Sequence, residues 1–188
     1  LGGKSPVIIS EQVDINKAAE SIITGKAMNG GQLCISPDYC LVPQGKLEAF
    51  VKQCRSVIAQ QYPTVQGNAD FTACINTRHF DRVKSYIDEA RDKGARIVPL
   101  CPQGEEFSSP DEHKIALHLV IDPDDSLACM QDEIFGAVMN IKTYSEIQDA
   151  IDFVNERERP LALYYFGNDK LEQAKVLDNT ISGGVTVN

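Results

Sequence analysis

The sequence predicts an α/β protein, a three-layer α-β-α domain built on a mostly parallel, open twisted sheet. The first observation is an alternation along the whole chain, in which short runs of β-branched and aromatic residues are followed by stretches with apolar residues at helical spacing. The second is composition, because 188 residues that are 43% hydrophobic and 24% charged can bury a sizeable core. This length is typical of one globular domain, so we expect residues 1–188 to form a single domain.

The first half of the chain contains two strand–helix pairs and a third helix. Asp14 is well placed to cap the first helix, and Tyr62-Pro63 ends the second. In order, we predict a strand at 6–9, a helix at 15–27, a strand at 39–42, a helix that begins at 47 and ends before 63, a loop at 66–75, and a helix that begins at 76 or 77 and stops at 94.

The second half continues the alternation with shorter elements. Ser145 is predicted to cap the helix that follows it, and Asn168 or Asp169 to cap the last helix. In order, we predict a strand at 96–100, a surface loop at 101–110, a strand at 115–121, a loop at 130–136, a strand at 138–144, a helix at 147–154, a strand at 161–166, a helix that includes 174–177, and a strand at 185–187.

The charge of the chain limits the partners that it can bind. A formal net charge of −9 and the absence of any basic run argue against nucleic-acid and anionic-membrane surfaces, which need clustered Lys and Arg. No apolar stretch approaches the roughly 18 residues that span a bilayer, and the first residues lack the pattern of a secretory signal. We therefore expect a soluble, cytoplasmic protein that binds neither nucleic acid nor membrane.

The cysteines are predicted to be reduced thiols, because a chain with this length and apolar content does not need disulfides for stability. No Cys-x-x-Cys occurs, and the three histidines neither pair at helical spacing nor lie near a cysteine in the sequence, so we predict no metal site. The cysteines are Cys34, Cys40, Cys54, Cys74, Cys101 and Cys129, and the histidines are His79, His113 and His118.

Cys34 differs from the other cysteines because it lies in a glycine-marked bend between a helix pattern and a strand pattern. Functional side chains concentrate on such connections. Gly30 and Gly31 allow the backbone to leave the helix through positive φ, and Pro37 resists extension of the helix. Free cysteines are usually buried small hydrophobes, which is the alternative interpretation. The polar, glycine-rich surroundings of Cys34 favour a thiol that meets a substrate.

A second candidate site is the segment Glu133-Ile134-Phe135-Gly136. If the backbone is extended there, the carboxylate and the aromatic ring lie on the same side, and Gly136 permits close approach. A carboxylate can accept hydrogen bonds from a ribose diol, and an aromatic ring can rest on a flat heterocycle. By composition alone, a solvated Glu and a core Phe are the commoner arrangement. Gly2-Gly3 fits a plain turn and a close ligand approach equally well.

Five segments of the chain form a recognisable set: Leu1-Gly2-Gly3-Lys4-Ser5-Pro6, Asn29-Gly30-Gly31-Gln32-Leu33-Cys34, Glu133-Ile134-Phe135-Gly136, Leu161 to Phe166, and Ser182 to Asn188. In combination and in this order, they resemble the catalytic half of an aldehyde dehydrogenase, and the resemblance spans essentially the whole chain. Within that family, the segments 36–39 and 159–164 are most similar to the branch that oxidises aromatic and fatty aldehydes, which implies an aromatic substrate such as coniferyl aldehyde.

The resemblance implies a role for each candidate residue. Cys34 matches the nucleophile, whose thiolate forms a thiohemiacetal and then a thioester with the aldehyde carbon. Its backbone N–H would help to hold the oxyanion. Glu133 matches the residue that binds the nicotinamide ribose, and Phe135 lies beside the nicotinamide. Leu1 and Gly2 match residues that line the nicotinamide pocket, and the implied cofactor is NAD or NADP.

Two parts of the family's active site have no counterpart in this sequence. The general-base glutamate directly precedes the Leu-Gly-Gly motif in the family, and the asparagine that completes the oxyanion hole belongs to the NAD(P)-binding domain. The chain begins without Met and ends on a strand pattern, so we expect a catalytic domain cut from a longer protein, inactive when isolated. The resemblance also implies a homodimer whose oligomerisation segments lie outside the chain.

Two other interpretations of the sequence remain open. The first is a thiol hydrolase or acyltransferase in which Cys34 works with a histidine that is distant in the sequence but close in space. The second is a folded module without catalytic activity, cut from a larger protein and retained for assembly or binding. A glutamate just before Leu1 and a glycine-rich strand–helix segment upstream would favour the dehydrogenase over both.

Overall fold

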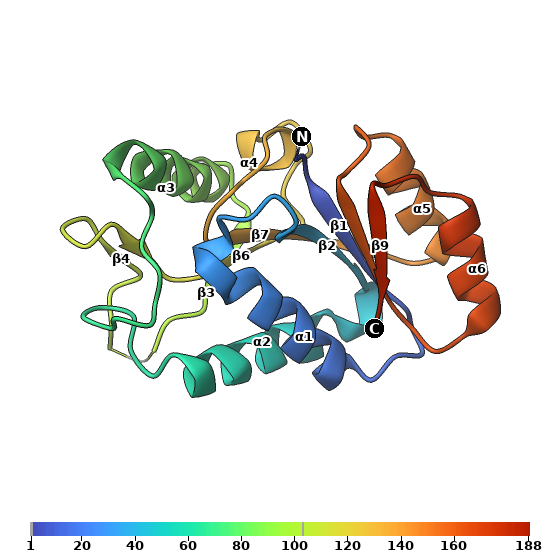
Figure 1. The fold of residues 1–188 in the computed structure, drawn as a ribbon, viewed down its shortest axis with the longest axis horizontal. Helices are drawn as coiled ribbons and strands as arrows, with labels where there is room; N and C mark the ends of the chain where they lie inside the picture. The colour runs from blue at the N-terminus through green and yellow to red at the C-terminus, as the bar shows by residue number, and fades with distance from the viewer. Residues whose placement is uncertain (1, 103) are drawn as a thin grey trace.

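The computed structural model describes residues 2–102 and 104–188. Seven strands form one open, twisted sheet (Figure 1). They are β1 (Ser5–Ile9), β2 (Pro37–Pro43), β3 (Arg96–Pro99), β6 (His118–Ile121), β7 (Val138–Tyr144), β8 (Ala162–Phe166) and β9 (Gly184–Val187). Their order in space is β3-β6-β7-β2-β1-β8-β9, and every neighbouring pair is parallel except β3 and β6. The predicted α/β class and mostly parallel sheet are confirmed.

Helices cover both faces of this sheet. They are α1 (Ile15–Ala27), α2 (Leu47–Gln61), α3 (Thr77–Asp92), α4 (Ala128–Gln131), α5 (Ile147–Asn155) and α6 (Lys170–Asp178), with short 3₁₀ helices η1 (Met28–Gly31) and η2 (Gln44–Lys46). In Figure 1, α1 and α2 lie together on one side of the sheet, while α5 and α6 lie beside β8 and β9. Helix α3 packs against α4, β3 and β6.

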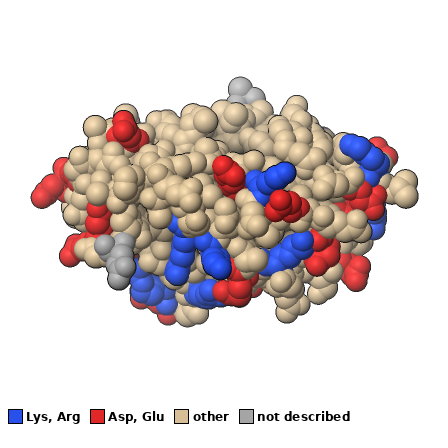
Figure 2. All heavy atoms as spheres, turned by 90° about the horizontal axis from the view of Figure 1, so that it is seen from below, with Lys and Arg blue, Asp and Glu red and all other residues tan. Residues whose placement is uncertain are grey.

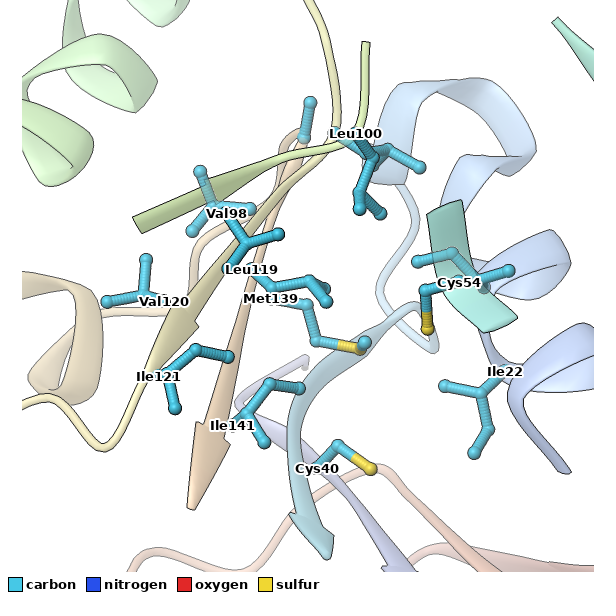
Figure 3. Packing of buried hydrophobic residues seen from close by; sticks show 14 of the residues in the cluster. Ile22, Cys40, Cys54, Val98, Leu100, Leu119, Val120, Ile121, Met139 and Ile141 are labelled. Carbon is cyan, nitrogen blue, oxygen red and sulfur yellow. The ribbon is translucent and has the colours of Figure 1, made fainter. Parts of the chain in front are cut away.

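The central strands bury both faces because successive side chains point to opposite sides. In β1, Val7 and Ile9 belong to the core beneath α1 and α2, whereas Ile8 belongs to the core beneath α5 and α6. Figure 3 shows the first of these cores, in which the sulfur atoms of Cys40 and Cys54 lie among apolar side chains. These two cysteines are therefore packing residues.

The helix starts show how local sequence determines the elements. Asp14 caps α1 through a bond from the Asn16 N–H at 3.0 Å, and Asp169 caps α6 through a bond from the Leu171 N–H at 2.8 Å. The prediction that Ser145 caps α5 was wrong, because the N-cap is Glu146. A capping box explains the difference, since the Glu146 side chain accepts from the backbone of the third helical residue and its own N–H donates to Asp149.

The region between β3 and β7 departs most from the predicted elements. The predicted strand at 115–121 is divided into two strands that belong to different sheets, with Ala116 and Leu117 between them. Residues 114–115 form β5 (Lys114–Ile115), which pairs with β4 (Ser108–Ser109) in a separate two-stranded sheet. The Ala116 N–H donates to the Phe107 carbonyl at 2.9 Å, inside the predicted surface loop. The predicted loop at 130–136 likewise begins within α4, which the sequence analysis missed.

Charged side chains of both signs lie on the surface. On the face shown in Figure 2, Lys and Arg side chains lie interspersed with Asp and Glu. Within the part of the chain that the structure describes, no helix is both long and apolar enough to cross a membrane.

The parallel sheet brings distant motifs to one edge. In a parallel sheet all amino ends lie on the same side. Gly2 and Gly3 directly precede β1, the Cys34 bend precedes β2, and the segment 133–136 precedes β7. Because β7, β2 and β1 are adjacent, these three segments meet at one end of the sheet.

Candidate functional site

Cys34 lies in a tight turn between η1 and β2. The backbone leaves η1 through three residues with positive φ, Asn29 at 51°, Gly30 at 61° and Gly31 at 76°. The Ser36 N–H then donates to the Leu33 carbonyl at 3.0 Å, which closes the turn around Cys34. Cys34 is exposed, whereas four of the other cysteines are buried and Cys101 is half-buried. The turn therefore presents its thiol to solvent, as the glycine-marked bend predicted.

Two side chains hold this turn, a role that the sequence did not predict for either of them. The Gln32 amide donates to the Ala73 carbonyl at 3.0 Å and accepts from the Ile75 N–H at 3.0 Å, so one side chain bonds to two backbone groups of the 73–75 segment. On the other side, the Tyr164 hydroxyl donates to the Ile35 carbonyl at 2.6 Å. The Cys34 turn is thus fixed by hydrogen bonds to two distant segments.

The Cys34 turn and the Glu133–Gly136 loop are in backbone contact. A Cβ placed on Gly31 would lie 2.3 Å from the Gly136 carbonyl oxygen, closer than any real Cβ contact. Gly136 in turn faces helix α3, where its own Cβ would lie 2.4 Å from Val83 Cγ2. Only glycine fits at either position, and this close approach is what joins the two predicted site segments.

Glu133 faces an open hollow of about 890 Å³ at this edge of the sheet, lined also by Gly2, Gly3 and Lys4. A Cβ on Gly2 would lie 2.8 Å from Glu133 Oε2, so Gly2 leaves the carboxylate uncovered. Phe135 remains 40% exposed, so its ring is partly open to solvent. Its φ of 45° departs from the extended backbone on which the predicted same-side placement of Glu133 and Phe135 depended. The structure therefore places Gly2 against Glu133, and the close approach of Gly31 and Gly136 joins the Cys34 turn to the loop that bears Glu133 and Phe135. Leu1, the other predicted cofactor-binding residue, lies outside the described residues.

A buried ion pair supports the loop from below. Lys4 pairs with Asp38, whose side chain is 4% exposed, and Lys4 Nζ also donates to the carbonyls of Cys129 at 2.7 Å and Asp132 at 2.8 Å. Asp38 Oδ2 accepts from the Ile134 N–H at 2.8 Å. Residues 132–136 have no regular secondary structure, so these side chains supply partners for the backbone there, among them the buried Ile134 N–H.

Helix α3 holds the same loop from the opposite side. Arg82 donates to the Ile134 carbonyl at 2.8 Å and to the Phe135 carbonyl at 3.3 Å, and the Tyr86 hydroxyl donates to the Asp132 carboxylate at 3.1 Å. The positive φ of Phe135 is unfavourable for a bulky residue, and the Arg82 bonds to the carbonyls of Ile134 and Phe135 stabilise this conformation.

Lys26 is the one lysine with a strongly perturbed pKa among the described residues. It lies in the last turn of α1, is fully buried, and its Cε would lie 3.2 Å from a Cβ on Gly31. Burial lowers the pKa of Lys26 to about 8, the Asp38 carboxylate opposes this shift, and Lys4 adds to it. The buried ammonium group of Lys26 therefore loses its proton more readily than that of an exposed lysine.

An apolar cavity of about 200 Å³ opens beside the Cys34 turn. Leu33 and Ile35, the two neighbours of Cys34, line it, together with Met28 and the rings of Tyr164 and Phe166. A closed apolar cavity of about 150 Å³ is large enough to take up a benzene molecule. The space beside the Cys34 turn is thus large enough for an aromatic ring.

None of the three histidines is bonded to Cys34 in the described part of the chain. His79 accepts from Arg82, His113 bonds to Thr77, and His118 is buried with its Nδ1 against the Ala116 carbonyl. Nothing in this arrangement favours a Cys–His hydrolase. Within residues 2–102 and 104–188, no three His, Cys, Asp or Glu side chains are grouped to hold a metal ion.

Sequence comparisons give the relatives of this chain. A sequence model of the aldehyde dehydrogenase family matches residues 1–188. A protein of Caulobacter vibrioides named probable coniferyl aldehyde dehydrogenase is 49% identical over 188 residues, which are all of this chain and 39% of that protein. The chain thus spans 39% of the length of this relative.

Solved structures share the fold over the whole chain. Substrate-bound AldH of Staphylococcus aureus superposes with a TM-score of 0.91 at 32% identity, and the match covers 40% of that structure. An aldehyde dehydrogenase of Mycobacterium tuberculosis in complex with NAD⁺ superposes with a TM-score of 0.85 at 27% identity, and the match covers 39% of that structure.

The exposure of Cys34 makes a prediction about thiol reactivity. In the 188-residue chain, brief iodoacetamide treatment should label Cys34 before the other cysteines, because burial raises the pKa of each of the others. Peptide mapping of the labelled protein is the measurement, and the half-buried Cys101 is the internal control. Label spread evenly over the six cysteines, or label at Cys101 with Cys34 protected, would contradict the exposed turn.

Proposed function

The chain belongs to the aldehyde dehydrogenase family, and from this premise we propose that it is the thiol-bearing catalytic domain of an NAD(P)-dependent enzyme that oxidises an aldehyde to a carboxylic acid. One observation carries the proposal. The exposed thiol of Cys34 lies on a turn whose Gly31 touches the Gly136 end of the loop that bears Glu133 and Phe135. A nucleophile and a candidate cofactor-binding carboxylate therefore share one edge of the sheet.

Cys34 carries the covalent chemistry in this proposal. Its thiolate attacks the aldehyde carbon, a C–S bond forms, and the carbonyl oxygen becomes an oxyanion that the Cys34 backbone N–H helps to hold. Loss of the hydride from the same carbon leaves a thioester, and water cleaves the thioester to the acid and the free thiol. The Gln32 and Tyr164 bonds hold the turn, so the thiol is held in place before the substrate arrives.

The residues at the hollow fit a nicotinamide cofactor. Gly2 leaves the Glu133 carboxylate open, and a carboxylate can accept hydrogen bonds from both hydroxyls of a ribose. The partly exposed ring of Phe135 offers a flat surface for a heterocycle. A bound NAD or NADP would supply the hydride acceptor. We assign Glu133, Phe135 and Gly2 to cofactor binding, and Leu1 joins them on the resemblance alone.

The substrate that fits the site is an aromatic aldehyde. The apolar cavity beside Cys34 has room for an aromatic ring, and the rings of Tyr164 and Phe166 form part of its wall. The Caulobacter relative bears the name of a coniferyl aldehyde dehydrogenase. We propose coniferyl aldehyde or a similar aromatic aldehyde as the substrate of the full-length protein.

The rest of the proposed active site belongs to the remainder of a longer protein. On the family resemblance, we assign to it the general-base glutamate, the oxyanion asparagine and the NAD(P)-binding domain. We also assign to it the segments through which two copies would form a homodimer, and we propose that the full-length protein is cytoplasmic. The isolated chain should therefore bind aldehydes at its thiol without oxidising them.

Substitution of Cys34 tests the nucleophile. In the full-length protein, Cys34→Ala should abolish the oxidation of every aldehyde and leave cofactor affinity nearly unchanged, because the thiol forms the covalent intermediate but makes few cofactor contacts. Steady-state rates and cofactor titrations are the measurements, with the buried Cys54→Ala as the matched thiol control. Residual activity above about a thousandth of wild type would be inconsistent with a nucleophilic role.

Substitution of Glu133 separates cofactor binding from proton transfer. Glu133→Gln in the full-length protein should raise the cofactor KM or slow hydride transfer by the equivalent of about 1 to 3 kcal/mol, as expected for a lost charged hydrogen-bond acceptor. Single-turnover kinetics measure the two chemical steps separately. If cofactor binding and hydride transfer are unchanged while thioester hydrolysis fails, Glu133 acts as the base and the assignment is wrong.

A further inference from the structure

We propose that Tyr164 supports Cys34 in two ways: its hydroxyl positions the Cys34 turn, and its ring forms the wall that selects aromatic aldehydes. The first role concerns the structure of the turn and is independent of the reaction. The second role rests on the proposed function, because it concerns which aldehyde reaches the thiol.

The hydroxyl contact joins two segments that are far apart in the sequence. Tyr164 lies in β8, and its hydroxyl donates to the Ile35 carbonyl at 2.6 Å. The next N–H, that of Ser36, donates to the Leu33 carbonyl at 3.0 Å. The peptide unit between Ile35 and Ser36 is therefore bonded at both its oxygen and its nitrogen. A peptide unit held in this way fixes the direction of the neighbouring Cys34 backbone.

The hydroxyl remains a donor at neutral pH. Burial raises the pKa of Tyr164, and the negative charge of a Cys34 thiolate raises it further. Cys34 is exposed, so packing around its own side chain does little to hold it. The turn depends on its hydrogen bonds instead.

The Tyr164 ring contributes to the apolar cavity beside the Cys34 turn. Tyr164 lines this cavity together with Leu33, Ile35 and Phe166, and none of the described residues that line it is charged. An aromatic wall packs well against an aromatic ligand, through offset or edge-to-face contacts. A substrate whose ring enters the cavity would contact Tyr164, whereas a short aliphatic aldehyde would make fewer such contacts.

Tyr165, the next residue of the same strand, provides a matched control. It points to the opposite face of the sheet, where it belongs to the core beneath α5 and α6, and its hydroxyl donates to Glu172 at 2.8 Å. Tyr164→Phe and Tyr165→Phe therefore remove the same atom from adjacent residues, and only the first removal affects the Cys34 turn.

Amide hydrogen exchange in the full-length protein tests the positioning role without substrate or cofactor. Tyr164→Phe should accelerate exchange in the peptide that contains Ser36 about tenfold, the effect expected for one lost hydrogen bond, and Tyr165→Phe should leave it unchanged. Equal exchange in Tyr164→Phe and wild type would overturn the positioning role, whatever the enzyme does.

Substrate preference tests the role of the ring. In Tyr164→Leu, the ratio of kcat/KM for benzaldehyde to that for propanal should fall at least tenfold, whereas Tyr164→Phe keeps the ring and should hold this ratio within about threefold of wild type. An unchanged ratio in Tyr164→Leu would overturn the selecting role. A wild-type protein that oxidises no aldehyde would overturn the proposed function and the selecting role together, and the exchange result would still decide the positioning role.

Discussion

The carboxylate of Asp38 joins the three segments on which the candidate site depends. It lies at the start of β2, four residues after Cys34, and it binds Lys4 just before β1 and the Ile134 N–H in the loop before β7. Lys4 extends the contact to the carbonyls of Cys129 and Asp132. A buried carboxylate that loses a partner is left with an uncompensated charge, which typically costs several kcal/mol. The amino ends of these three strands are therefore held together by electrostatics as well as by the sheet.

This arrangement places the candidate site at an edge that is unusual for an open α/β sheet. Ligands of open α/β sheets commonly bind beyond the carboxyl ends of the strands, whereas here the thiol and the Glu133 loop meet at the amino ends of β1, β2 and β7. Two glycines make the meeting possible, because any side chain at Gly31 or Gly136 would collide with the facing segment. The helices complete the site from outside, α1 by delivering the chain to the Cys34 turn and α3 by holding Phe135 through Arg82.

Local signals in the sequence predicted most of the elements, and long-range contacts explain what was missed. The caps at Asp14 and Asp169 depend on residues two or three positions away, so the sequence shows them. The break after Ile115 depends on the distant Phe107 carbonyl, which no local pattern reveals. Asp38 carried a signal that went unused, since a lone acid in an otherwise apolar strand needs a buried partner. The glycine-marked bend in the sequence indicated an accessible Cys34, but the predicted roles of Cys34 and Glu133 came from the family resemblance.

Lys4 and Asp38 act as one unit in holding the loop before β7, and a double-mutant cycle tests this directly. Amide exchange in the peptide that contains Ile134 would be measured in the full-length protein for Lys4→Met, Asp38→Asn and the double variant. Each single substitution should accelerate exchange at least tenfold, and the double variant should exchange little faster than either, a coupling of about 1 kcal/mol or more. If the acceleration of exchange in the double variant equals the product of the two single accelerations, the two side chains act independently, which would contradict the proposed coupling.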